Sequence, residues 1–280
     1  MREGQWYPGN MARAINNLRQ DLKVIDLVVE LLDARIPSSS RNPMFARLLG
    51  DKKHLLLLHK ADRAEEAATG RWLSFFKRQG KRAMPFSIYT KSSINYLLRF
   101  LKQEERGMRS SRLKRPLRMM FIGIPNVGKS TLINYFVKKA VTRTGNRPGI
   151  TRGRQWIRIM PNLELLDTPG ILWPKLTEET SYPLAAVGAI PAGRIDLQNI
   201  AIWLIERYLE RGKEQFLFQR YQGLPAGEAE YMLEQIGVSQ GCLQSAGKVD
   251  LERAAALLLR DFQDGLLDRI TLENPPVVET

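Results

Sequence analysis

"GIPNVGKS", residues 123–130, stands between an apolar run and a pattern of helical spacing. It fits Gly-x4-Gly-Lys-Ser, in which the glycines let backbone N–H groups turn inward around phosphate oxygens. The preceding run, Leu117–Ile122, has the length of a strand, and the N-terminus of a following helix adds a favourable dipole. A chance glycine turn is the alternative, but a strand before it and a helix after it disfavour that reading. The stretch predicts a phosphate-binding loop in an α/β domain.

Each residue of this loop has an expected task. Lys129 reaches the β- and γ-phosphates of a bound nucleotide and so takes part in catalysis, and the hydroxyl of Ser130 ligates Mg²⁺. The residues expected to contact the nucleotide here are Asn126, Val127, Gly128, Lys129, Ser130 and Thr131.

Two segments downstream supply further groups on the phosphate side. In "LELLDTPG", residues 163–170, Asp167 ends a buried strand, where a carboxylate can hold the Mg²⁺ shell. Gly170 offers a flexible backbone N–H to the γ-phosphate. In "RPGIT", residues 147–151, the hydroxyl of Thr151 can complete the magnesium coordination, which makes Thr151 a catalytic candidate.

An earlier apolar run, "LLLLHKADR" at residues 55–63, ends in a Lys-x-Asp pair that resembles the Asn-Lys-x-Asp motif of GTPases. A single carboxylate can accept hydrogen bonds from both N1–H and N2–H₂ of guanine, so Asp62 is expected to read the base while Lys60 packs near it. Ligands bind outside the carboxyl ends of parallel strands, and both Asp62 and Gly123 follow such ends. Spatial neighbours need not be neighbours in the chain, so the order of the two motifs is no objection to a GTP site.

Two further features concern the base. His59 stands where asparagine normally ties the base loop to the phosphate loop, and a neutral imidazole can make only part of that hydrogen-bond set. We therefore expect weakened nucleotide affinity with guanine specificity intact. Ser87 and Ile88 end the next strand and are expected to pack over the base, although the glycines usual in such a segment are absent.

Strands alternate with helices over the first part of the chain, which indicates a mostly parallel sheet covered on both faces. The expected strands are 26–33, 54–58, 82–87, 117–122, 155–160 and 163–166, and the expected helices are 10–23, 43–49, 65–79 and 92–105. The polar, basic stretch 107–116 is expected to be a connector. Later, only helical patterns of comparable strength remain, at 197–211, 227–235 and 250–264. We predict an α/β P-loop domain over residues 1–177 and a small all-α domain over residues 178–280.

Charge is distributed unevenly along the chain. Residues 1–174 contain 33 Lys and Arg against 13 Asp and Glu, whereas residues 175–280 contain 10 against 16. One stretch, 138–158, has seven basic residues and no acid: Lys138, Lys139, Arg143, Arg147, Arg152, Arg154 and Arg158. Such density favours a nucleic-acid partner; a generally basic surface without a specific partner is the alternative.

The remaining composition limits the class of protein. A single cysteine, Cys242, excludes an internal disulfide framework and fits a reducing compartment. No apolar run approaches the length of a membrane span, and the N-terminus lacks the apolar core of a signal peptide. We expect a cytoplasmic protein without a membrane partner.

The order of motifs is base-reading, base-packing, phosphate loop, switch threonine and Asp-x-x-Gly. It resembles the circularly permuted GTPases, and most closely the RbgA (YlqF) family of ribosome-assembly GTPases. The segments that carry the resemblance are "WYPGNM", "DARIPSSSRNP", "KAD", "GIPNVGKSTLIN", "RPGIT" and "LLDTPGILWPK". The resemblance implies GTP and GDP binding, a role late in assembly of the large (50S) ribosomal subunit, and contacts with ribosomal RNA and, through the C-terminal bundle, with RNA or a ribosomal protein.

The hydrolytic residues depart from common patterns. Ile171 stands where Ras-like enzymes carry a glutamine that orients water. In related GTPases with such a hydrophobic residue, the asparagine at the position of Asn126 helps to hold K⁺, so the resemblance implies potassium stimulation. The family's catalytic histidine corresponds to Asn10, which can orient water but cannot act as a general base. Asn10 as a helix cap is the alternative.

We therefore expect a slow GTPase switch that the ribosome and potassium stimulate. The contact of Gly170 with the γ-phosphate is expected to be transmitted to residues 178–280. Two other functions remain open at this point: a GTP-binding scaffold on ribosomal particles that does not hydrolyse GTP, and a GTPase that acts on another RNA.

Overall fold

The computed structural model describes residues 8–110, 115–144, 156–166, 177–191, 196–245 and 247–276. It divides into two compact units. The first unit comprises Met1–Lys175 together with Glu273–Thr280, and the helical unit comprises Leu176–Leu272. The chain thus returns to the first unit with its last eight residues, which the expected division at residue 178 had assigned to the helical domain.

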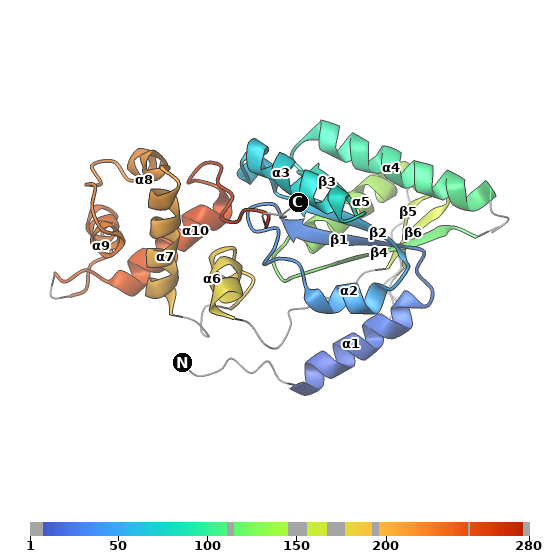
Figure 1. Ribbon diagram of the computed structural model, residues 1–280, viewed down its shortest axis with the longest axis horizontal. Helices are drawn as coiled ribbons and strands as arrows, with labels where there is room; N and C mark the ends of the chain where they lie inside the picture. The colour runs from blue at the N-terminus through green and yellow to red at the C-terminus, as the bar shows by residue number, and fades with distance from the viewer. Residues whose placement is uncertain are drawn as a thin grey trace. The chain divides into compact units, whose positions relative to one another are not determined.

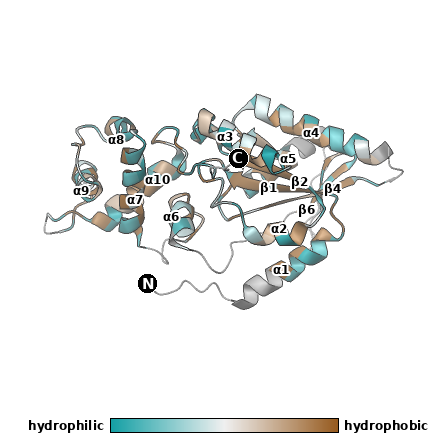
Figure 2. Ribbon diagram, viewed as in Figure 1, coloured by the Kyte–Doolittle hydropathy of each residue, from teal (hydrophilic) through white to brown (hydrophobic). Residues whose placement is uncertain are grey.

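A six-stranded sheet forms the centre of the first unit (Figure 1). Its strands are β1 (Leu27–Asp33), β2 (Lys53–His59), β3 (Arg82–Phe86), β4 (Leu117–Gly123), β5 (Trp156–Met160) and β6 (Leu163–Leu166). The spatial order is β3-β2-β1-β4-β6-β5, and every neighbouring pair is parallel except β5 with β6. All seven residues of β1 are buried, as expected of a central strand covered on both faces, and Figure 2 draws β1 in the hydrophobic colour.

Helices cover both faces of this sheet. They are α1 (Pro8–Leu22), α2 (Pro43–Leu49), α3 (Glu66–Arg78), α4 (Lys91–Ser110) and α5 (Lys129–Thr144), with a short 3-10 turn, η1 (Ala61–Arg63). Apolar residues of α1 and α2 pack with Val28 of β1, and Trp72 of α3 packs with Leu32 of the same strand, so these three helices share one face. Phe121 of β4 stacks on Phe136 of α5, and successive strand residues alternate, so α5 covers the other face.

The helical unit contains α6 (Glu178–Ala186), α7 (Leu197–Glu210), α8 (Glu214–Arg220), α9 (Ala229–Ser239) and α10 (Leu251–Asp264). Its core residues include Leu204, Met232 and Leu258, each fully buried. Two buried tyrosines satisfy their hydroxyls inside this unit, because Tyr208 donates to Leu267 O at 3.1 Å and Tyr221 donates to Asp261 Oδ2 at 2.9 Å. Within the described ranges, no helix is both long enough and apolar enough to cross a membrane.

Three expectations from the sequence need correction. The stretch 107–116 is not all connector, because α4 continues to Ser110. The helices α6 and α8 have no counterpart in the prediction; α6 contains Pro183, and α8 has only seven residues, so neither shows a strong helical period. Helix α1 begins at Pro8, so Asn10 is its third residue rather than its cap.

Candidate functional site

The sheet order brings the base-reading motif and the phosphate loop together. β2 carries the base motif, β4 leads into the phosphate loop, and β1 lies between them, parallel to both. The register aligns Asp33 at the end of β1 with His59, and Leu31 with Gly123. The carboxyl ends of the three strands therefore meet at one edge, where open parallel sheets bind ligands.

The phosphate loop has the backbone that its glycines predict. Gly123 has φ of 153°, and a Cβ there would lie 2.6 Å from Leu31 O; Gly128 has φ of 105°. α5 starts directly after the loop at Lys129, whose Nζ donates to the carbonyl oxygens of Gly123 at 3.3 Å and Ile124 at 3.2 Å. Lys129 is buried and is held inside the loop, where the N-terminus of α5 also favours an anion.

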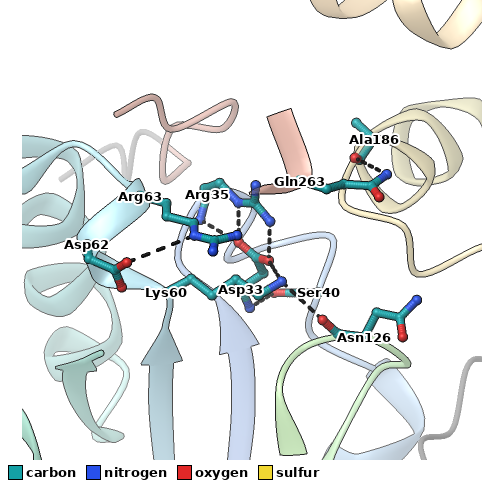
Figure 3. Close-up of polar contacts among 9 residues, drawn as sticks. All are labelled: Asp33, Arg35, Ser40, Lys60, Asp62, Arg63, Asn126, Ala186 and Gln263. Carbon is teal, nitrogen blue, oxygen red and sulfur yellow. Dashed lines mark hydrogen bonds and ion pairs between the residues drawn. The ribbon is translucent and has the colours of Figure 1, made fainter. Parts of the chain in front are cut away.

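A buried carboxylate at the end of β1 joins the two motifs (Figure 3). Asp33 is fully buried, and its Oδ1 accepts from Arg35 Nε at 2.9 Å and from Arg35 N at 3.1 Å. Its Oδ2 accepts from Arg35 Nη2 and from Lys60 Nζ, each at 2.9 Å. The N–H of Asp33 donates to Ser40 Oγ at 3.1 Å, which fixes the backbone that carries the carboxylate.

Lys60 extends this network to the phosphate loop. Its Nζ donates to Asn126 O at 3.0 Å as well as to Asp33. Both Lys60 and Asn126 have positive φ, 60° and 57°, a conformation that L-residues rarely adopt. Strain of this kind persists only where surrounding contacts determine it, and here the ammonium bridge supplies them. The Lys60 ammonium thereby connects the predicted base motif with the predicted phosphate loop.

The charges of this network determine its pKa values. Burial alone would raise the pKa of the Asp33 carboxyl, but the charges and hydrogen bonds of Arg35 and Lys60 outweigh it and hold that pKa well below its ordinary value. Burial lowers the pKa of Lys60, and Asp33 opposes that shift. Asp33 is therefore ionised at neutral pH, and its carboxylate anchors two cations.

His59 contacts the phosphate loop by packing. A Cβ on Gly128 would lie 2.7 Å from His59 Cε1, and the imidazole ring lies 5.5 Å from the Phe86 ring, centroid to centroid. Burial and the neighbouring charge of Lys60 lower the pKa of His59 from 6.5 to about 4, so the ring is neutral. Neither ring nitrogen has a hydrogen-bond partner among the described residues. His59 therefore makes no side-chain hydrogen bond to the described residues of the phosphate loop, and Lys60 Nζ makes the connection.

The predicted base-contacting residues follow β2 and β3. Asp62 lies in η1 with its side chain 28% exposed, and its Oδ2 is 3.9 Å from Arg63 Nε. Ser87 directly follows β3; it is buried, and its Oγ accepts from Tyr89 N at 3.2 Å. Ile88 is partly buried. The Asp62 carboxylate is thus partly open, whereas the Ser87 hydroxyl already holds the turn that leads into α4.

The loop after Asp33 is tied down by the end of the chain. The carboxylate of Glu273 accepts from Ser38 N at 2.7 Å and from Ser39 N at 3.2 Å. The carbonyl of Glu273 accepts from Trp72 Nε1 at 3.1 Å. Burial raises the pKa of Glu273 against these hydrogen bonds, which lower it. Residues far apart in the chain thus fix the loop that carries Arg35 and Ser40.

Several predicted residues lie outside the described part of the chain. They are Thr151, Asp167 and Gly170, together with Ile171. For Asn10 only the helical backbone is described. Of the residues predicted to hold Mg²⁺, Ser130 alone is described; it is exposed in the first turn of α5 beside Lys129, as a hydroxyl ligand beside a nucleotide phosphate requires. Asn126, the predicted potassium ligand, is also exposed.

Asp33, Arg35 and Ser40, whose contacts connect the two motifs, were not predicted from the sequence. The segment "DARIPSSSRNP" that contains them follows β1 directly, at the carboxyl end of a strand. Their position could have predicted their place at the site, because polar residues just after a central parallel strand lie at the ligand-binding edge of the sheet.

Known proteins resemble this chain over nearly its whole length. The family described as "50S ribosome-binding GTPase" matches residues 118–215. A Priestia megaterium protein named Ribosome biogenesis GTPase A is 40% identical over 284 residues, covering 98% of this chain and 98% of that protein. The GNP-bound crystal structure of YlqF from T. maritima gives a TM-score of 0.66 at 29% identity and covers 94% of this chain and 98% of that one. A GDP-bound structure of TM YlqF gives 0.65 at 28%, covering 92% and 99%. The fold class predicted from the sequence is confirmed.

Proposed function

The chain belongs to the ribosome biogenesis GTPase A family, and on that premise we propose that it is a GTP-hydrolysing switch in late assembly of the large ribosomal subunit. It works in the cytoplasm, binds GTP and GDP with Mg²⁺, and contacts pre-ribosomal particles through their rRNA.

One observation carries the proposal. Lys60 of the base-reading motif donates to the carbonyl of Asn126 in the phosphate loop at 3.0 Å, although 66 residues separate them and the order of the motifs is reversed. A base reader and a phosphate loop that share one hydrogen bond form a single nucleotide site. The Lys60 ammonium also donates to Asp33, so both halves of the site are held in position before a nucleotide binds.

The base half of the site favours guanine. The partly exposed carboxylate of Asp62 accepts from N1–H and N2–H₂ of the base, and Ser87 with Ile88 packs over it. An adenine would leave the carboxylate without donors and would place its own amino group elsewhere. Specificity therefore comes from Asp62, whereas Lys60 and His59 set the position of the loop.

The phosphate half of the site stabilises charge. Backbone N–H groups of Asn126, Val127 and Gly128, with the start of α5, receive phosphate oxygens, and Lys129 moves from the loop carbonyls to the β- and γ-phosphates. The ligands proposed for Mg²⁺ are Ser130, Thr151 and Asp167, which are all oxygen donors; Thr131 follows in the same helix turn. Bound Mg²⁺ neutralises charge on the phosphates.

Hydrolysis is slow in the isolated protein. With Ile171 in the glutamine position and Asn10 in the histidine position, the chain offers no general base at either place. Asn10 would orient water without accepting its proton, and Asn126 would help to hold K⁺, which would supply positive charge where the transition state becomes negative. The ribosomal particle accelerates the reaction. Loss of the γ-phosphate releases Gly170 and repositions the helical unit.

The experiment is single-turnover phosphate release with GTP, with and without K⁺ and isolated large subunits. Acceleration by subunits in potassium supports the switch, and Asn10→His, which restores the family residue, is expected to raise the rate of the isolated protein at least about tenfold. Na⁺ in place of K⁺ is the matched control for the ion.

The second candidate is a scaffold that binds GTP and ribosomal particles without hydrolysis, and Asn10 together with Ile171 favours it. No acceleration by subunits, combined with stable sedimentation on them in GTP, would support the scaffold. Failure to sediment with large subunits in either GTP or GDP would contradict both candidates and direct attention to another RNA.

A further inference from the structure

Helix α4 (Lys91–Ser110) presents a basic face to solvent. The buried residues Ile94, Leu97, Leu101 and Met108 lie along one side of it. Successive helix residues turn by about 100°, which places the centre of the opposite side near Arg99. The exposed residues on that side are Lys91, Asn95, Tyr96, Arg99, Lys102 and Arg106. Figure 2 draws α4 with hydrophilic residues along much of its length.

In the described part of α4, no acid lies on this face. The acidic residues of α4 are Glu104 and Glu105, and neither belongs to the exposed side. Glu104 is buried, where Lys53 Nζ donates to it at 2.8 Å and Arg82 Nη1 donates at 2.5 Å. Among the described residues, Arg99, Lys102 and Arg106 have no ion-pair partner. A row of unpaired cations on a regular helix is an electrostatic footprint for a polyanion.

Aromatic rings accompany the cations. The Tyr96 side chain is 53% exposed, and the Arg99 guanidinium lies 5.8 Å from the centroid of its ring. Tyr89, in the turn before α4, is 76% exposed. Nucleic-acid bases stack on tyrosine rings and on arginine planes, and Tyr96 with Arg99 offers both side by side. An acidic protein would use the cations but would have no need of the rings.

We propose that the exposed face of α4 is an RNA-docking surface that holds phosphates along Arg99, Lys102 and Arg106 and stacks an unpaired base on Tyr96. The cations from Lys91 to Arg106 extend over about 22 Å, roughly one per helical turn. This inference rests on the proposed ribosomal function and names the surface by which the GTPase unit contacts RNA. α4 follows Ser87 and Ile88 by three residues, so bound RNA lies beside the base-packing segment.

The test uses the full chain and a fluorescent oligouridylate of about 12 nucleotides, long enough to span the helix. The triple variant Arg99→Gln, Lys102→Gln, Arg106→Gln removes three charges while keeping good helix formers. The matched control, Arg47→Gln, Lys77→Gln, Arg78→Gln, removes three exposed charges from α2 and α3. Affinity is measured by anisotropy from about 50 to about 300 mM salt.

We expect the α4 variant to bind the oligonucleotide about tenfold more weakly or worse. The slope of log K against log [salt] should fall in magnitude by about 2, because each of the three lost phosphate contacts contributes about 0.7. Tyr96→Ala should weaken binding about tenfold with the slope unchanged. An equal loss of RNA affinity in the control triple variant would overturn the proposal. Displacement of the RNA by polyglutamate at the same charge concentration would also overturn it, because that result would assign the face to an acidic protein.

Two readouts separate this inference from the proposed function. GDP affinity should be the same in the wild type and in both triple variants, because none of the changed residues lies in the nucleotide site. Wild-type protein that binds the oligonucleotide through α4 but does not sediment with large subunits would contradict the ribosomal function alone. Sedimentation that the α4 changes leave intact at every salt concentration would contradict this inference alone.

Discussion

Replacing Asp33 by Asn should both destabilise the first unit and loosen its nucleotide site. The Asn side chain keeps one carbonyl oxygen, but its NH₂ group would face Arg35 Nη2 and Lys60 Nζ, two donors that lie 2.9 Å from the present Oδ2. The side chains of Asp33 and Arg35 are 0% and 1% exposed, so the buried guanidinium would lose the carboxylate that faces it. Removing one partner of a buried pair costs about 3–5 kcal/mol, a large fraction of the roughly 5–15 kcal/mol that a domain has.

Asp26→Asn is the matched control. Asp26 also makes a two-pronged pair with an arginine, Arg115, at 2.7 Å for each contact, but at the other end of the same sheet and with side chains 18% and 38% exposed. Its loss should cost about 1 kcal/mol or less. Urea unfolding gives both free energies, and titration with fluorescent GDP gives the affinities. Equal destabilisation by the two substitutions would refute the role assigned to burial.

If Asp33→Asn does not fold, Lys60→Met provides the second test. Arg35 still neutralises Asp33 in that variant, so the fold should persist, while the bond to Asn126 is lost. We expect GDP affinity to fall about tenfold, the equivalent of one hydrogen bond to a charged group. Unchanged GDP affinity in Lys60→Met would show that the bridge does not organise the site.

Three further outcomes follow from the site. The pKa of His59 falls from 6.5 to about 4 on folding, so the unfolded chain takes up a proton at a higher pH than the folded chain does. The free energy of unfolding should therefore decrease by up to about 3 kcal/mol as the pH falls from 6.5 to 4. Urea titrations should show this decrease, and the His59→Asn variant should lack it. Gly128→Ala, with φ of 105° and a Cβ 2.7 Å from the imidazole, should lose GDP binding, and normal GDP binding would contradict the contact. Glu273→Ala should speed amide hydrogen exchange at Ser38 and Ser39 at least about tenfold, whereas unchanged exchange would show that the tail does not hold this loop.

The sequence predicted the parts of the fold that depend on local patterns. The strands at residues 27–33, 53–59 and 117–123 and the glycine loop were predictable, because apolar runs of strand length and Gly-x4-Gly-Lys-Ser have direct physical meanings. The rule for carboxyl ends of parallel strands was enough to predict that the strands before Asp62 and before the phosphate loop end at the same edge of the sheet. The short helix α8 and the proline-containing α6 were missed, since tertiary packing stabilises helices with little period of their own.

The part of the site that escaped prediction depends on strand order. Asp33 lies between the two motifs only because β1 is inserted between β2 and β4, and no local pattern specifies that insertion. The same applies to Glu273, whose contact with Ser38 joins residues 235 positions apart. The sequence allowed a neutral His59 to make part of the hydrogen-bond set with the phosphate loop; in the structure its ring packs near Phe86, and Lys60 makes the connection.

Competition of GTP and ATP against fluorescent GDP, in the wild type and in Asp62→Ala, tests most directly whether the reversed motifs form one guanine site. We expect the wild type to prefer GTP by about a hundredfold or more, because ATP leaves the carboxylate without donors. Asp62→Ala should lose this preference while still binding triphosphates through Lys129. Equal affinity of the wild type for GTP and ATP, or a preference for GTP that survives in Asp62→Ala, would contradict this expectation.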